Sequence, residues 1–315
     1  MTDYKNLLKK IHEKYLPSTK GSLASYIPEL AKIDPNLFAI SITTVDGKTY
    51  SHGDINSFFT LQSTSKPFTY GLALMDHGPE FVHQRVGVEP SGEAFNSIIE
   101  LEKNSHRPFN PMINSGAIAV ASMIQDKLLD NNEIYIRSDR MLDLFSSLCG
   151  KKLEINEQVF LSEKKTAHRN RAIAHLLRHF DVIGNDIEES LDLYFKQCSV
   201  EINIIDLSQM AATLANQGVQ PISKIKIYDE QYITDMIGLI FTCGMYDTAG
   251  AWAYQVGIPA KSGVSGAIFG VIPGVMGIAV YSPLIDDHGH SVRGVNAIKD
   301  ISQELKLNIF RQQKR

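Results

Sequence analysis

The stretch FTLQSTSKPFTYGLALM, residues 59–75, decides how this sequence is interpreted. Its first residues are β-prone, and from about Pro67 onward the pattern is helical. Ser63 and Lys66 stand at the junction, three residues apart. A spacing of three places two side chains on one face of a helix, one turn apart. The pair is therefore either a nucleophile with its base, or a polar helix cap followed by a solvated lysine.

The surroundings of this pair favour the catalytic interpretation. The Ser63 hydroxyl is expected at the positive end of a helix dipole. The nearby apolar residues are Phe58, Phe59, Leu61, Phe68, Tyr70 and Leu72. Desolvation among such side chains lowers the pKa of a lysine, which can then take the serine proton near neutrality. The same spacing recurs at Ser162/Lys165 and Ser223/Lys226, in a charged stretch and a polar loop, where we predict no such chemistry.

Strand signals come from both ends of the chain. Residues 36–54 predict a hairpin closed at Asp46-Gly47, with a type I′ turn. Residues 256–263 predict one more strand, and residues 266–284 predict two, divided by Pro273-Gly274. Residues 25–35 predict a short helix, and residues 70–210 carry mostly helical apolar stripes. Tight turns between the strands favour antiparallel order.

The predicted fold class is therefore α+β, an antiparallel sheet flanked by helices with an inserted all-helical domain. Residues 1–70 and 211–315 are expected to form the sheet-plus-helices domain. Residues 71–210 are expected to form the inserted domain. The active-site cleft is expected between the two, where small-molecule sites usually form.

Composition excludes several classes of function. The 315 residues are 43% hydrophobic and 21% charged with a net charge of −4, as in ordinary globular proteins. Acids and bases are mixed, so we predict no nucleic-acid partner and no membrane surface. No run approaches the roughly 18 apolar residues of a membrane span, and the amphipathic N-terminus is unlike a signal peptide. Three widely spaced cysteines indicate buried thiols in a reducing compartment, so we expect a cytoplasmic protein.

Two further segments suit serine acyl transfer. KSGVSG, which begins at Lys261, has the Lys-Thr/Ser-Gly arrangement of such enzymes. Gly263 permits close backbone approach, and the Val264 amide is placed to donate to an oxyanion. The alternative is a plain glycine-bearing strand start. In CGMYDTAG, Tyr246 lies between glycines, where it is either a proton relay or a core tyrosine.

Asparagines and histidines offer weaker signals. Asn110 and Asn114 stand where a helix would begin, so either suits an N-cap, and Asn114 can instead face the cleft. His175 and His179 have a metal-ligand spacing, but no glutamate lies between them and arginines flank them. We therefore predict no metal site. Both histidines of DDHGHS, His288 and His290, are expected in a solvated turn.

Seven blocks occur in one order: LQSTSKPF, GVEPSG..FN, NPMINSGAI, SE......RN, LYFKQCS, CGMYD and KSGVSG. With SYIPELAKIDP before them, the sequence resembles the serine-dependent glutaminase family from about Gly21 to Gln303. That family has a β-lactamase/penicillin-binding-protein fold with an inserted helical domain. The resemblance implies hydrolysis of L-glutamine to L-glutamate and ammonia without a cofactor. It also implies a homodimer or homotetramer.

The resemblance also implies roles for residues. The family nucleophile falls on Ser63 and its lysine on Lys66. The substrate-contacting residues fall on Tyr26, Asn114, Glu163, Asn170, Tyr194, Tyr246 and Val264, together with Ser63. Glu163 suits the substrate ammonium, and Asn114, Asn170 and Tyr194 suit its carboxylate. From the residues alone, a structural interpretation of Glu163, Asn170 and Tyr194 is preferred. Ser115 stands where we expect alanine in the family.

The expected mechanism begins when neutral Lys66 accepts the Ser63 proton with help from a tyrosine. Ser63 attacks the side-chain amide, and the backbone amides of Ser63 and Val264 hold the oxyanion. Tyr246, or less favourably Tyr194, passes a proton to ammonia, and water then hydrolyses the γ-glutamyl ester. Two alternatives stay open: a β-lactamase or peptidase of the same fold, and a sensor that is acylated without turnover.

Overall fold

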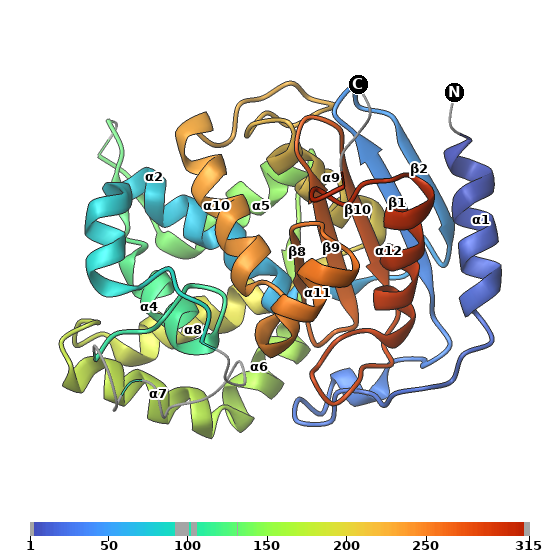
Figure 1. The fold of residues 1–315 in the computed structure, drawn as a ribbon. Coiled ribbons are helices and arrows are strands. Elements are labelled where there is room, and N and C mark those ends of the chain that lie inside the picture. The colour runs from blue at the N-terminus through green and yellow to red at the C-terminus, as the bar shows by residue number, and fades with distance from the viewer. Residues whose placement is uncertain (1–2, 92–100, 102–105, 131, 312–315) are drawn as a thin grey trace.

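The computed structural model describes residues 3–91, 101, 106–130 and 132–311 (Figure 1). Most of the block GVEPSG is included, but the rest of GVEPSG..FN lies outside the described residues. The helical part of the chain lies on one side in this view, and the main sheet on the other.

The main sheet draws its strands from both ends of the chain. Its antiparallel order is β2-β1-β10-β9-β8. The strands are β1 Ala39–Thr44, β2 Thr49–Gly53, β8 Ala260–Ser262, β9 Ala267–Ile272 and β10 Met276–Tyr281. The predicted hairpin and C-terminal strands are thus confirmed. The type I′ turn is wrong, because Gly47 has a positive φ (90°) and Asp46 does not, whereas that turn needs both.

Strand alternation explains how both faces of this sheet are covered. Ile268 and Ile278 point into a cluster with α1 (Tyr4–Tyr15), α11 (Ala249–Gln255) and α12 (Val292–Glu304). Phe269 and Ala279, one residue along, point into the larger cluster with α9 (Ile204–Ala215). Side chains one apart on a strand face opposite ways, so a sheet covered on both faces needs apolar residues at nearly every position. Figure 1 shows α11 and α12 on the near face.

Contact between α9 and the sheet is very close. A Cβ added at Gly277 on β10 would lie 2.3 Å from the Ala212 backbone nitrogen, so only glycine fits there. Beside it, the Ser208 hydroxyl on α9 is 2.9 Å from Ser41 Oγ and 2.8 Å from Thr43 Oγ1 on β1. These buried hydroxyls satisfy one another, so the polar residues cost the interface little.

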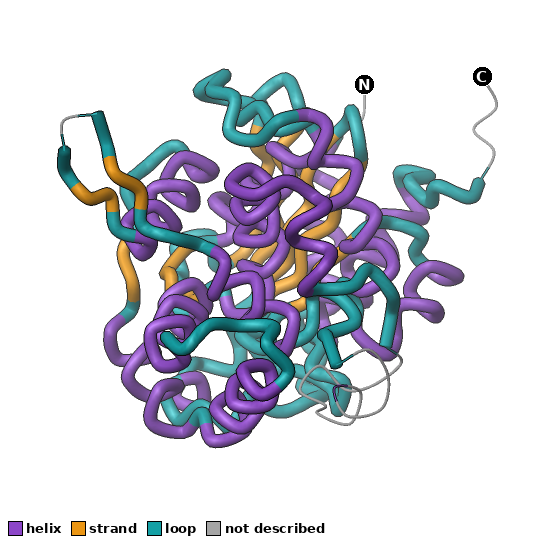
Figure 2. The backbone as a smooth tube through the Cα atoms, turned by 90° about the vertical axis from the view of Figure 1, so that its left-hand side faces the viewer, coloured by secondary structure: helices purple, strands orange, loops and turns teal. Residues whose placement is uncertain are grey.

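The middle of the chain is largely helical, as predicted (Figure 2). Its helices are α2 Lys66–Arg85, α4 Asn114–Met123, α5 Arg137–Cys149, α6 Glu157–Thr166, α7 His168–His179 and α8 Ile187–Cys198; α10, Glu230–Cys243, follows α9. Short strands form two small sheets: β3 Phe59–Thr60 with β7 Val200–Ile202 and β6 Glu154–Ile155, and β4 Lys127–Leu128 with β5 Ile134–Tyr135. The helix predicted over residues 25–35 is only a 3-10 turn, η1, at Leu30–Lys32.

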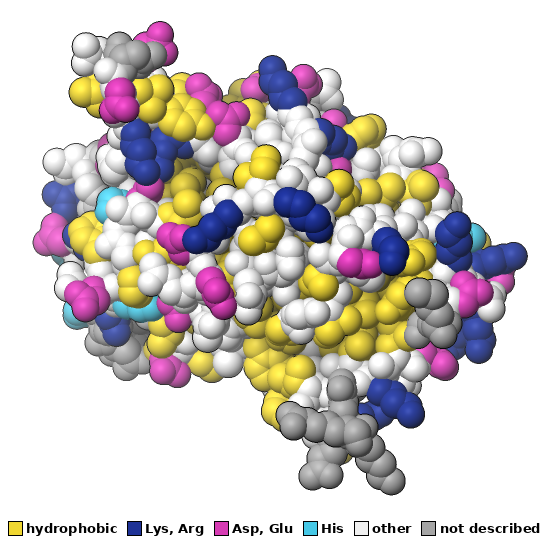
Figure 3. All heavy atoms as spheres, turned by 90° about the horizontal axis from the view of Figure 1, so that it is seen from above, with side chains coloured by type: hydrophobic (Ala, Val, Ile, Leu, Met, Phe, Trp, Pro, Cys, Tyr) yellow, Lys and Arg dark blue, Asp and Glu magenta, His cyan; other side chains and the backbone are white. Residues whose placement is uncertain are grey.

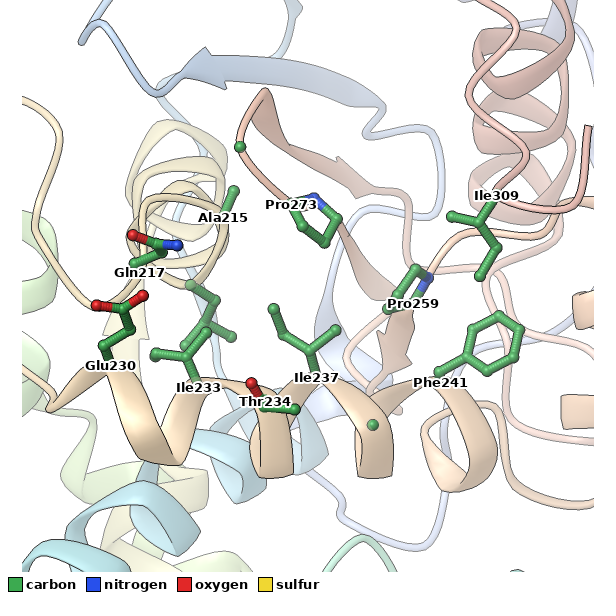
Figure 4. A pocket seen from close by; sticks show the side chains of 13 residues that line it. Ala215, Gln217, Glu230, Ile233, Thr234, Ile237, Phe241, Pro259, Pro273 and Ile309 are labelled. Carbon is green, nitrogen blue, oxygen red and sulfur yellow. The ribbon is translucent and has the colours of Figure 1, made fainter. Parts of the chain in front are cut away.

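The surface carries charges of both signs without segregation on the face in Figure 3. Across the described residues, no helix has the length and apolar character needed to cross a membrane. All three cysteines, Cys149, Cys198 and Cys243, are buried and free, as predicted. A pocket of about 480 Å³ opens between α10, the β9–β10 turn and Ile309 (Figure 4). It is lined by none of the predicted site residues, so its size says nothing about the chemistry.

Candidate active site

Ser63 lies in a 3-10 turn, η2 (Gln62–Ser65), between β3 and α2. The turn begins at Gln62 with a φ of 48°, a left-handed conformation that costs a non-glycine residue about 1–2 kcal/mol. Hydrogen bonds hold it: Leu61 N donates to Val200 O at 2.9 Å, Thr64 N donates to Leu61 O at 3.1 Å, and Ser65 Oγ donates to Gln62 O at 2.7 Å. Ser63 is therefore fixed just before the N-terminus of α2.

Lys66, the first residue of α2, is 1% exposed. Its ammonium donates to Asn114 Oδ1 at 2.7 Å and to Met112 O at 3.3 Å. Burial lowers its pKa to about 8, against the opposing effects of Cys198 and Glu163. An amine with this pKa is partly neutral near pH 7, so it can accept a proton without extreme conditions.

Tyr246 opens a second 3-10 turn, η3 (Tyr246–Thr248), again with a positive φ of 51°. Its phenol donates to Ser262 O at 3.1 Å. Burial raises its pKa, and a hydrogen bond with Ser63 opposes that rise. Because the single phenol proton goes to Ser262 O, the Tyr246 oxygen is the acceptor for the Ser63 hydroxyl. Ser63 therefore already points its proton at Tyr246.

The end of β8 packs directly against the Ser63 turn. A Cβ at Gly263 would lie 3.1 Å from Thr64 Cγ2 and 3.2 Å from Leu61 O, so a larger residue would press the two segments apart. Within the described part of the chain, the backbone N–H groups of Ser63 and Val264 donate to no backbone carbonyl. Two unpaired donors beside a hydroxyl have the composition of an oxyanion hole.

Lys261 is a buried lysine that the motif contained but to which we assigned no role. Its ammonium donates to Ser262 O at 2.6 Å and lies 4.0 Å from the centre of the Tyr246 ring. Burial lowers its pKa well below its usual range, and Lys66 adds to the effect. Lys261 thus holds in place the Ser262 carbonyl, which also accepts the hydrogen bond from the Tyr246 phenol.

Four of the family-implied residues line one cavity of about 80 Å³: Tyr26, Asn114, Glu163 and Asn170. Asn114 does not cap its helix through its side chain, because its amide turns inward and donates to Asn170 Oδ1 at 3.0 Å. Tyr26 is 53% exposed and lies at the rim. The asparagine pair joins this cavity to Lys66, since Asn114 also accepts from the lysine.

Glu163 is the carboxylic acid of this cavity. It is buried near the end of α6, and burial raises its pKa to about 8, although Lys66 and a hydrogen bond with Gln62 pull it down. Its Oε2 has no hydrogen-bond partner among the described residues. A buried acceptor without a partner costs about 1–3 kcal/mol, so a cationic ligand group would be bound favourably here.

Tyr194 belongs to the same buried group. It lies on α8, and burial raises its pKa, with Cys198, Glu163, Tyr26 and Tyr246 adding to the rise. The Cys198 thiol hydrogen-bonds with Tyr194. Of the two candidate relay tyrosines, only Tyr246 has a hydrogen bond with Ser63 among the described contacts.

Several expectations need correction. His290 is 2% exposed and its ring stacks on that of Tyr246, with centroids 5.5 Å apart, whereas His288 is on the surface as expected. The solvated-turn prediction is therefore wrong for His290, because the turn folds back onto η3. Asn110 is not an N-cap either; its Oδ1 accepts from Met112 N in the loop before α4. Ser115 is buried as the second residue of α4.

Sequence reasoning also missed Gln62, whose side chain hydrogen-bonds with Glu163. The sequence did carry one signal for Gln62, namely its position directly before Ser63. Among the described residues, no group of three or more histidines, cysteines or acids is arranged to hold a metal.

The glutaminase family model matches residues 21–310 of this chain. The chain belongs to the glutaminase family. It is 52% identical to the glutaminase of Nostoc sp. (strain PCC 7120 / SAG 25.82 / UTEX 2576) over 304 residues, 96% of this chain and 89% of that protein. It is 46% identical to glutaminase 2 of Clostridium perfringens (strain 13 / Type A) over 292 residues, 92% of this chain and 94% of that protein.

Solved glutaminase structures have the same fold. A probable glutaminase, YbaS, superimposes with a TM-score of 0.93 at 37% identity, covering 99% of this chain and 100% of that one. Mglu in its Tris and glutamate form superimposes with a TM-score of 0.92 at 38% identity, covering 100% of this chain and 69% of that one. The predicted α+β, β-lactamase-like glutaminase fold is confirmed, and the chain is a glutaminase, EC 3.5.1.2.

Proposed function

We propose that this glutaminase hydrolyses L-glutamine to L-glutamate and ammonia through a γ-glutamyl ester on Ser63. The observation that carries the proposal is the Ser63 hydroxyl, hydrogen-bonded with Tyr246 and one helical turn from a lysine with a pKa of about 8. The crystal structure of the relative Mglu in a glutamate form supports a glutamate-shaped site in this fold.

Substrate recognition is assigned to the cavity beside Lys66. Glu163 receives the substrate ammonium, which gives its unpaired Oε2 a partner. Asn114, Asn170 and Tyr194 donate to the substrate carboxylate, and Tyr26 closes the rim. A site built on such paired groups rejects amides that lack them, because its polar atoms would stay buried and unpaired.

Acylation forms the Ser63 ester bond, breaks the amide C–N bond and moves two protons. Tyr246 takes the Ser63 proton along their hydrogen bond and passes a proton on to neutral Lys66, and Oγ attacks the γ-amide carbon. The backbone N–H groups of Ser63 and Val264 stabilise the oxyanion. As the C–N bond breaks, Tyr246 gives a proton to the departing ammonia.

Deacylation reverses the relay. Water gives a proton to Tyr246 and attacks the ester carbon, and the Ser63 oxygen leaves and regains its proton from Lys66, which becomes neutral again. Among the described contacts, Ser63 bonds with Tyr246 and not with Tyr194, so Tyr194 is assigned to binding rather than to the relay. No step requires a metal or cofactor.

Ammonia release from L-glutamine, L-asparagine and D-glutamine tests the proposal. We expect turnover of L-glutamine, and a loss on the order of 10⁴-fold or more for Ser63→Ala. Ser223→Ala, at a pair with the same spacing, serves as the control and should match the unsubstituted protein. Near-normal ammonia release by Ser63→Ala would sink the scheme.

The two alternatives have their own signatures. Steady hydrolysis of a chromogenic β-lactam without glutamine turnover would favour a β-lactamase or peptidase. A persistent adduct on Ser63 in the mass spectrum, without ammonia release, would favour a sensor. Neither alternative accounts for the joint presence of Glu163, Asn170 and Tyr194.

We further propose the domain organisation, the oligomeric state and the cellular location of this protein. The sheet-plus-helices domain comprises residues 1–70 and 211–315, the helical domain comprises residues 71–210, and the site lies in the cleft between them. The chain assembles as a homodimer or homotetramer, which analytical ultracentrifugation measures. The three free cysteines support residence in the reducing cytoplasm.

A further inference from the structure

The turn that carries Tyr246 is short, strained and held from outside. η3 has only three residues, and Tyr246 itself has a φ of 51°. A non-glycine residue in this conformation persists only where its surroundings impose it. The segment that imposes it lies far along the chain, in the turn from Asp286 to His290.

His290 contacts both ends of η3. Its ring stacks on the Tyr246 ring with centroids 5.5 Å apart and planes 11° from parallel. Its Nε2 lies 2.9 Å from Thr248 Oγ1 at the other end of the turn. Because the Thr248 hydroxyl donates its only proton to Met245 O at 2.8 Å, the histidine must be the donor to Thr248. One side chain therefore fixes the ring and the end of the turn together.

The position of His290 is itself fixed. Asp286 Oδ1 accepts from the backbone N–H of His290 at 2.9 Å and from that of His288 at 3.0 Å. Asp286 N also donates to His290 O at 2.9 Å. His288, two residues away, is half exposed; it bonds to Asp247, the middle residue of η3, at 2.9 Å, and its ring stacks on that of His290 with centroids 6.4 Å apart, but no contact with the Tyr246 ring is found among the described residues. The two histidines of one turn thus differ in what they can control.

The charge state of His290 limits what it can do. Burial lowers the pKa of His290. The charges of Asp286 and Asp247 oppose this effect, whereas Lys261 and His288 add to it. The ring is therefore neutral near pH 7, with its proton on Nε2. It carries no charge to the reaction and has no bond with Ser63, so its influence passes through the placement of Tyr246.

We propose that His290 is a positioning residue for glutamine hydrolysis, which holds the Tyr246 phenol on the Ser63 hydroxyl by stacking on its ring and bonding to Thr248. The inference rests on the proposed relay role of Tyr246. Small displacements of a catalytic group cost rate steeply, so the contact has a measurable effect on kcat.

A set of matched variants tests this. His290→Ala should lower kcat for L-glutamine about 10-fold, with a smaller change in KM. His290→Phe keeps a stacking ring and should stay within about 3-fold of the unsubstituted kcat, whereas His290→Gln keeps a donor without the ring and should resemble the alanine variant. His288→Ala is the control on the same turn and should change kcat less than about 2-fold. The Phe and Gln variants nearly fill the site, so they decide the matter even where His290→Ala does not fold.

Measuring His290→Ala in a Tyr246→Phe protein separates the relay role of Tyr246 from the positioning role of His290. There, His290→Ala should cost less than about 2-fold more, since the phenol is already gone. Three results would overturn the inference and leave the relay intact. They are an equal loss of kcat from His290→Ala in both backgrounds, a normal kcat for His290→Ala and His290→Gln, and a loss from His288→Ala equal to that from His290→Ala. A normal kcat for Tyr246→Phe alone overturns the relay assignment, and this inference with it.

Discussion

Ser63/Lys66 and Ser223/Lys226 share one spacing, but they lie in opposite surroundings. Lys66 is 1% exposed and donates to Asn114 and Met112. The Lys226 side chain is 61% exposed and pairs with Asp229 at 2.6 Å. Burial penalises the ammonium in the first pair, where it lowers the pKa of Lys66 to about 8. The difference teaches that surroundings, and not spacing, decide whether the lysine of such a pair is desolvated.

The largest expected effect comes from removing the lysine of each pair in turn, which tests whether the buried pair alone is required for activity. Lys66→Ala should lower kcat on the order of 10²- to 10⁴-fold, because the proton acceptor for Ser63 is lost. Lys226→Ala should leave kcat within about 2-fold, since an exposed ion pair contributes little. Ammonia release measures both. Equal effects would mean that burial does not distinguish the pairs.

A second test asks whether the cavity beside the buried pair binds the substrate ammonium. Glu163→Gln should lower kcat/KM for L-glutamine about 10- to 100-fold, because a charge-assisted bond of roughly 1.5–3 kcal/mol is lost. Most of the loss should appear in KM. Glu157→Gln, at the exposed start of the same helix, is the control. An unchanged KM for Glu163→Gln would place the ammonium elsewhere.

The smallest effect concerns stability rather than rate. The folded pKa of Lys66, about 8, lies below the ordinary 10.5, so between these pH values the unfolded chain binds a proton that the folded chain does not. Folded-state stability from this group therefore rises with pH across that window, by about 3 kcal/mol, and is lost as the pH falls through 8.

Denaturant unfolding at several pH values measures this rise. Glu163→Gln is compared with Glu163→Gln/Lys66→Met, so that the neighbouring carboxyl is absent from both proteins. The difference in unfolding free energy should move in favour of the lysine-containing protein as pH increases. A flat difference across this pH range would contradict the desolvation of Lys66.

Much of the site could be predicted because its parts are contiguous. The Ser63/Lys66 spacing, the glycine after Ser262 and the glycines flanking Tyr246 are each local patterns. The main sheet was equally accessible, since apolar strands joined by tight turns carry a strong local signal.

The remainder depended on tertiary contacts. The sheet β3-β7-β6 consists of strands of two or three residues, too short for a periodic signal. His290 stands in a polar, glycine-containing turn, and its burial arises only when that turn folds onto η3. Glu163 and Asn170 look like ordinary helix residues until α6 and α7 bring them to one cavity.

The close fit at Gly263 has a consequence for when the chain becomes an enzyme. Ser63 and Lys66 are synthesised early, but Gly263 and Val264 directly follow β8, an edge strand made late in synthesis. A nascent chain therefore carries its proposed nucleophile long before it has the second proposed oxyanion donor. Loosening of that edge strand in the finished protein would silence the nucleophile in the same way, while the helical core stayed folded.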